Sequence, residues 1–141
     1  MRPIEFRAWH KQERKMYEVI ALHLGVQHGM ARGDCVNYVG LYGKSKLYIE
    51  GEEVELLEYT GLKDCKGEKI YEGDIVKVDS GLDELKVSVI EYKQGCFITK
   101  GIHSRKYSSL STWVAFSDTM EYIEIIGNIY ENKELLSNGE S

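Results

Sequence analysis

The sequence is poor in the residues that cross-link or stiffen small proteins. Its 141 residues include three cysteines and one proline. Cys35, Cys65 and Cys96 are odd in number and widely spaced. No Cys-x-x-Cys pair occurs, so we expect free thiols rather than a disulfide framework or a zinc site. A single proline also excludes the collagen-like and proline-rich linker classes.

Long apolar runs are absent as well. The longest runs, such as residues 113–116, have only a few members, whereas a membrane-spanning helix needs about 20. The first residues are charged from Arg2 onward and lack the apolar stretch of a signal peptide. We therefore expect a protein of the cytoplasm that does not contact the membrane.

Positive charge is in the minority. Lysine and arginine total 18 against 23 aspartate and glutamate residues, which gives a formal net charge of -5. This balance argues against a protein that coats nucleic acid by bulk charge, although it leaves room for a local basic face. A hydrophobic fraction of 43 % is ordinary for a globular chain.

The apolar residues mostly alternate with polar ones, which is typical of half-buried strands. Short strands separated by turns every 8–12 residues predict a mainly β fold. We expect N-terminal strands and hairpins over 1–58, and a small SH3-like barrel with a short terminal helix over 59–136. Asn132 is the predicted cap of that helix. Residues 137–141 are expected to be a frayed tail.

Three blocks of sequence resemble the YopX family of phage and prophage proteins. The first is Ile4-Glu5-Phe6-Arg7-Ala8-Trp9, the second runs from Tyr59 to Val76, and the third runs from Ile125 to Leu136. The resemblance implies a mainly β protein with an SH3-type barrel, encoded by a phage or prophage of a bacterial host. It implies no catalytic residue and no cofactor. Its signature positions, which we expect to be structural, are Trp9, Gly61, Asp64, Gly67, Gly73, Asp74, Gly127 and Asn128.

No catalytic motif is present, since the nucleophile elbow, the P-loop, the His-Glu-x-x-His pattern and the EF-hand pattern are all missing. Asp64, Glu68, Glu72 and Asp74 are close in sequence and could hold a metal or act as acid and base. They stand beside glycines, however, where aspartate commonly bonds its own backbone and glycine supplies a positive φ. We therefore favour turns at Asp64 and at Gly73, and we expect neither an enzyme nor a metal site.

The stretch from Tyr92 to Ser117 contains no acidic residue. It carries the four cations Lys93, Lys100, Arg105 and Lys106, with the aromatic residues Phe97 and Tyr107 between or beside them. Cations bind phosphates and aromatic faces stack on bases, so this stretch predicts a contact surface for single-stranded nucleic acid. The alternative is a solvated loop.

Three functions remain open from these observations, of which an enzyme is the least favoured because no catalytic motif is present. The first is a self-associating protein-interaction module, most simply a dimer, which binds a host or phage protein. The second is a nucleic-acid-binding module that uses residues 93–106.

Overall fold

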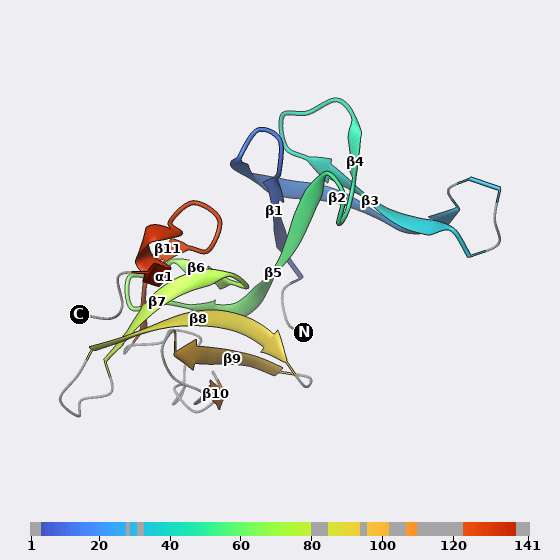
Figure 1. The fold of residues 1–141 in the computed structure, drawn as a ribbon. Coiled ribbons are helices and arrows are strands. Elements are labelled where there is room, and N and C mark those ends of the chain that lie inside the picture. The colour runs from blue at the N-terminus through green and yellow to red at the C-terminus, as the bar shows by residue number, and fades with distance from the viewer. Residues whose placement is uncertain are drawn as a thin grey trace. The chain divides into compact units, whose positions relative to one another are not determined.

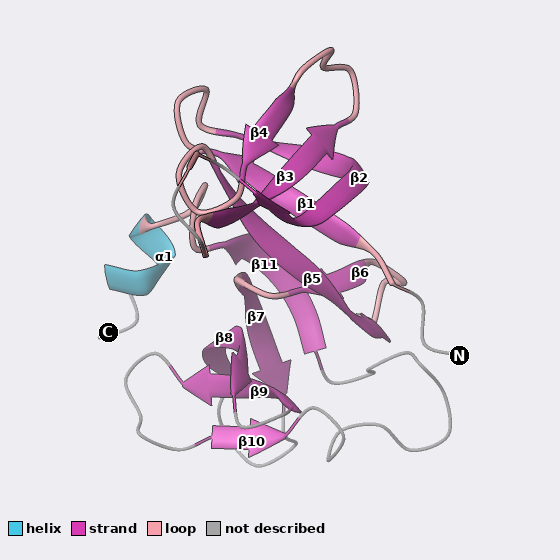
Figure 2. Ribbon diagram, turned by 90° about the vertical axis from the view of Figure 1, so that its right-hand side faces the viewer, coloured by secondary structure: helices cyan, strands magenta, loops and turns pink. Residues whose placement is uncertain are grey.

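The computed structural model describes residues 4–27, 29–30, 33–79, 85–93, 96–101, 107–109 and 123–137. These residues form eleven strands and one short helix, and every named pair of strands is antiparallel (Figure 2). The prediction of a mainly β protein is therefore confirmed. No helix in the described ranges is long and apolar enough to cross a membrane.

The chain divides into two compact units between Glu58 and Tyr59. The N-terminal unit comprises residues 5–58, and the C-terminal unit comprises residues 59–141 together with residues 1–4. Strand β5, Val54–Lys63, continues from the first unit into the second.

The N-terminal unit is a sheet built from hairpins, with the strand order β4-β3-β2-β1-β5. The strands other than β5 are β1 (Phe6–His10), β2 (Lys15–Gln27), β3 (Cys35–Leu41) and β4 (Leu47–Ile49). One face buries a core of Ala8, Val39, Leu41, Tyr48 and Val54. The strands β2 and β3 extend together beyond the ends of β1 and β4 (Figure 1).

Strand β2 is interrupted twice by bulges, where it gains one residue relative to β3. The first lies between Val19 and Ala21, and the second lies between His23 and Val26. Gly25 sits in the second bulge with φ +64°, a conformation that glycine adopts without strain. Its N–H donates to Oδ1 of Asn37 at 2.9 Å. Sequence alone predicts a strand over 16–24 and a loop or weak hairpin connection over 25–33. The bulge instead lets the strand continue to Gln27.

The C-terminal unit holds a five-stranded sheet in the order β10-β9-β8-β7-β11. Its elements are β7 (Asp74–Asp79), β8 (Leu85–Lys93), β9 (Cys96–Gly101), β10 (Tyr107–Ser109), β11 (Ile123–Asn128) and α1 (Glu134–Ser137), while β6 (Lys69–Tyr71) pairs with β5. The core contains Ile70, Val76, Val78, Ile90, Phe97 and Ile123.

Two details of this unit differ from the prediction. A barrel needs its outer strands to pair with each other, and among the described strands β10 and β11 do not, so the sheet is not closed. Sequence alone also predicts a strand over 110–116, and these residues lie outside the described ones. The predicted helix is present, and the hydrogen bond found for the Asn132 side chain differs from the expected cap: its Oδ1 accepts the backbone N–H of Asn128, which precedes the helix, at 3.1 Å.

Candidate interaction surface

The central signature contains a buried aspartate whose carboxylate accepts hydrogen bonds from backbone groups. Asp64 is 1 % exposed. Its Oδ1 accepts the backbone N–H groups of Lys66 and Glu68, both at 2.9 Å, and its Oδ2 accepts that of Ile125 at 3.0 Å. Gly67 completes the turn at φ +82°. The predicted turn is confirmed, and both carboxylate oxygens are engaged by backbone donors.

The second turn of this block, before β7, is also held by an aspartate that accepts a backbone N–H. Oδ2 of the buried Asp74 accepts the N–H of Tyr71 at 2.8 Å. Gly73 has φ +82°, as expected from its place between a turn and a strand. A Cβ at Gly73 would lie 3.5 Å from side-chain atoms of Ile129 and Tyr130. Within the described ranges, no group of three or more His, Cys, Asp and Glu side chains is placed to hold a metal ion.

The C-terminal signature is a packing motif around one glycine. A Cβ at Gly127 would lie 2.6 Å from Oδ1 and 2.7 Å from Cγ of Asn132. The Asn132 side chain occupies this space because it accepts the N–H of Asn128. Oδ1 of Asn128 in turn accepts the N–H groups of Tyr130 and Glu131. Gly127 is therefore required by the neighbouring asparagine and not by its own backbone angle.

The two remaining signature residues are also structural. Trp9 is 8 % exposed on β1. Gly61 has φ +87° on β5, where the ladder with β6 is irregular. The signature thus marks turns, bulges and buried side chains.

The basic stretch is described only in part. Lys93 is exposed at the end of β8. The register of β9 and β10 places Tyr107 opposite Lys100, whereas Arg105 and Lys106 lie outside the described residues. Phe97 needs a correction as a stacking residue, because it is 9 % exposed and belongs to the core. Its edge contacts the more exposed Tyr92, with ring centroids 5.0 Å apart.

The structure also contains a polar cluster at the β1–β2 turn, which no sequence motif predicts. Glu13 lies at its centre. Its Oε1 accepts the Tyr17 hydroxyl at 2.6 Å, and its Oε2 lies 2.8 Å from Nζ of Lys44 and 3.1 Å from Nε2 of His10. Nδ1 of His10 accepts the N–H of Glu13 at 3.1 Å, so a neutral imidazole with its proton on Nε2 satisfies both contacts.

The electrostatics of this cluster favour a structural role. Hydrogen bonds from Lys44 and then Tyr17 lower the pKa of Glu13 to about 2. The bond to Glu13 raises the pKa of Tyr17 and that of Lys44. General acid–base catalysis needs pKa values near the working pH. Here the three values move away from neutrality, so the cluster serves to hold the β1–β2 turn to Lys44 in the β3–β4 turn.

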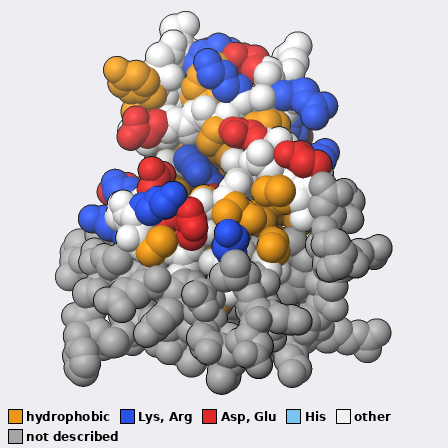
Figure 3. Space-filling view, turned by 90° about the vertical axis from the view of Figure 1, so that its left-hand side faces the viewer, with side chains coloured by type: hydrophobic (Ala, Val, Ile, Leu, Met, Phe, Trp, Pro, Cys, Tyr) orange, Lys and Arg blue, Asp and Glu red, His pale blue; other side chains and the backbone are white. Residues whose placement is uncertain are grey.

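The most unusual surface is the projecting part of the β2–β3 hairpin, residues 19–27, 29–30 and 33–38, which we call the arm. Four large apolar side chains are exposed on it: Ile20 (62 %), Leu24 (68 %), Val26 (36 %) and Met30 (103 %). Single exposed apolar residues are common, but several on one hairpin indicate an interaction surface. On another described face, charges of both signs are intermixed with hydrophobic side chains (Figure 3). We take the arm as the candidate site.

Comparison with known proteins agrees with this structure. A family model described as "YopX protein" matches residues 5–137. The chain belongs to the YopX family. This confirms the resemblance seen in the three sequence blocks.

Two solved structures share the fold. Protein EF1440 from Enterococcus faecalis is 24 % identical, with a TM-score of 0.58, and the match covers 96 % of this chain and 99 % of that one. Protein yopX from Bacillus subtilis is 20 % identical, with a TM-score of 0.60 over 96 % and 98 % of the two chains. Among curated proteins there is no match. At these identities the likeness shows the fold, and neither name states an activity.

Proposed function

We propose that this YopX-family protein is an accessory protein of a phage or prophage that acts as a self-associating protein-interaction module in the cytoplasm of the bacterial host. A dimer is the favoured assembly. The observation that carries the proposal is the arm, on which Ile20 and Leu24 are more than half exposed. Covering such side chains with a partner removes apolar surface from water, which contributes about 25 cal/mol per Å² before the entropy cost of association is subtracted.

A binding role also fits the chemistry of the polar groups. The buried carboxylates Asp64 and Asp74 accept backbone hydrogen bonds. The carboxylate of Glu13 is held in its charged form by Lys44 and Tyr17. Each of these groups contributes to the fold, whereas the exposed apolar side chains of the arm are not part of the described core.

The first test is the mass of the protein in solution. Light scattering at rising concentration should give a mass that increases from 16.2 kDa toward twice that value. A mass that stays at 16.2 kDa at high micromolar concentration would reject self-association. Affinity capture from infected cells, with and without nuclease, would then show whether a host or phage protein is retained when nucleic acid is destroyed.

Binding of single-stranded nucleic acid is the second candidate. It is favoured by the register that sets Tyr107 opposite Lys100, an aromatic residue beside a cation. Fluorescence anisotropy with a short single strand should then show affinity falling steeply with salt, because each neutralised phosphate contributes about -0.7 to the logarithmic slope. Changing Arg105 and Lys106 to alanine should reduce that slope by about 1.4. The absence of binding at low salt would remove this candidate.

A further inference from the structure

One edge of strand β2 has no neighbour along most of the arm. β3 runs beside β2 from Val19 to Gln27, whereas β1 pairs with β2 only from Lys15 to Glu18. Among the described strands, residues 19–26 therefore have a strand on one side only. A strand edge presents N–H and C=O groups that can pair with another chain.

This edge has few of the features that usually prevent such pairing. Residues 19–26 read Val-Ile-Ala-Leu-His-Leu-Gly-Val and contain no proline and no Asp, Glu, Lys or Arg. By contrast, β4, β6 and β10 are only three residues long, and β11 carries Glu124, which pairs with Lys66 at 2.8 Å. Short or charged edges resist pairing.

The two bulges limit the usable stretch but do not remove it. Bulges twist an edge and interrupt its ladder. Between them, Ala21, Leu22 and His23 pair regularly with β3. Those three residues are the middle of the free edge, with the exposed Ile20 and Leu24 directly on either side.

We infer that the free edge of β2, residues 19–26, pairs antiparallel with the same edge of a second copy of this chain. This inference rests on the proposed self-association and names its surface. A two-fold interface brings the same patch of both copies together. In an antiparallel pair of identical strands with matching faces, one residue must then stand opposite its own copy. A centre at Leu22 sets Ile20 opposite Leu24 of the second copy, so the apolar residues cover each other.

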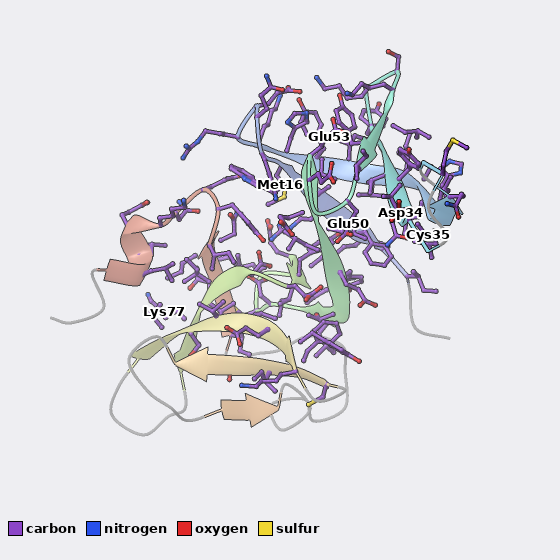
Figure 4. All side chains as sticks on the ribbon, turned by 45° about the vertical axis from the view of Figure 1, so that its right-hand side comes forward. Met16, Asp34, Cys35, Glu50, Glu53 and Lys77 are labelled. Carbon is purple, nitrogen blue, oxygen red and sulfur yellow. The ribbon has the colours of Figure 1, made fainter. Side chains whose placement is uncertain are left out.

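The charges at the two ends of the arm favour a second copy as the occupant. Lys15 is exposed at the base of the arm, and Asp34 is exposed at its tip. Figure 4 shows Met16 and Asp34 at opposite ends of the hairpin. Antiparallel pairing brings each base to the tip of the other copy. The ladder between the copies is confined to residues 19–25, because β1 already pairs with β2 from Lys15 to Glu18.

Analytical ultracentrifugation of the full chain tests this surface. Leu24→Lys places a charge on the edge and should raise the dissociation constant of the dimer at least about tenfold. The matched control is Tyr42→Lys, because Tyr42 is 67 % exposed, as Leu24 is, but lies beyond β3; it should leave the constant unchanged. Lys15→Glu should weaken the dimer, and adding Asp34→Lys should restore it.

A second measurement decides the question even if Leu24→Lys fails to fold. The three native cysteines are exposed and can be changed to serine. A single cysteine is then placed at position 21, 22 or 23, and at position 42 as the control. Mild oxidation should give a disulfide-linked dimer from one of the first three positions and none from position 42.

The outcomes separate the two proposals. A wild-type dimer that withstands Leu24→Lys and forms no cross-link from 21, 22 or 23 overturns the β2 edge, while self-association through another surface stands. A wild-type chain that remains a monomer overturns both. A dimer weakened by Leu24→Lys and cross-linked at one central position supports both.

Discussion

Replacing Asp64 with alanine should destabilise the protein by about 3–5 kcal/mol, because one buried side chain satisfies three backbone donors. Two of them, the N–H groups of Lys66 and Glu68, belong to its own turn. The third, from Ile125, is 61 residues away on β11. The alanine variant removes the acceptor from all three and leaves the buried position empty of polar atoms.

The magnitude follows from the kind of hydrogen bond that is lost. A bond to a charged group contributes about 1.5–3 kcal/mol net. The bond to Ile125 is counted in full, because it joins the turn to a strand. The bonds to Lys66 and Glu68 are discounted, since both residues are exposed and their N–H groups can turn to water. Asp64→Asn keeps one carbonyl oxygen for the turn but sets an amide donor against Ile125, so its cost should be about 1.5–3 kcal/mol.

Urea denaturation at one fixed protein concentration measures these differences, because association would otherwise add to the apparent stability. Glu68→Ala is the matched control: it alters an exposed carboxylate in the same turn and should change the free energy of unfolding by less than about 0.5 kcal/mol. If Asp64→Ala were as stable as this control, the three hydrogen bonds could not have the importance assigned to them.

Three further predictions concern turns and charge. Gly73→Val should lower the free energy of unfolding by about 1–3 kcal/mol, measured by thermal unfolding, because Gly73 has a positive φ. Gly67→Val should lower it less, because Gly67 has the same φ but no atom lies within 4 Å of its Cβ position. Equal losses of stability in the two variants would contradict a packing contribution at Gly73. Gly127→Ala should lower the free energy of unfolding by about 1–3 kcal/mol by overpacking. This loss should be smaller in an Asn132→Gly background, where the contacting side chain is gone. If the effects of the two substitutions were strictly additive, the two residues would not be in contact. The folded-state pKa of Glu13 is lowered from 4.5 to about 2, so its stabilisation is present above pH 4.5 and is lost as the pH falls toward 2. The stability difference between wild type and Glu13→Gln should therefore narrow over that window, and a difference independent of pH would refute the assignment.

The parts of the fold that sequence could predict are those set by neighbouring residues. An aspartate followed three residues later by glycine specifies a turn through its own side chain and one positive φ, so the turn from Asp64 to Gly67 was predictable. The positive φ of Gly73 was predictable from its place between a turn and a strand. Alternation of apolar and polar residues is likewise local, and it predicted most strands. The bond from Ile125 to Asp64 spans the chain and had no local signal.

The terminal helix shows where local reasoning fails. Asn132 precedes a short helical segment and matches the preference for asparagine at a helix start. Its side-chain Oδ1, however, accepts the N–H of Asn128, four residues earlier. Gly127 makes room for this hydrogen bond, since a Cβ at Gly127 would overlap the side chain of Asn132. The role of Asn132 therefore depends on a residue five positions earlier.

The candidate site was the hardest part to predict, because it consists of what the fold leaves uncovered. Sequence shows that the segment around Leu22 is apolar and suits a strand, and such a segment is normally assigned to the interior of a sheet. Whether it is interior depends on the length of its neighbours. β1 ends its pairing with β2 at Glu18, while β2 continues for nine more residues through two bulges. The edge of β2 is thus exposed because β2 is longer than β1, and no single segment of the sequence determines both lengths.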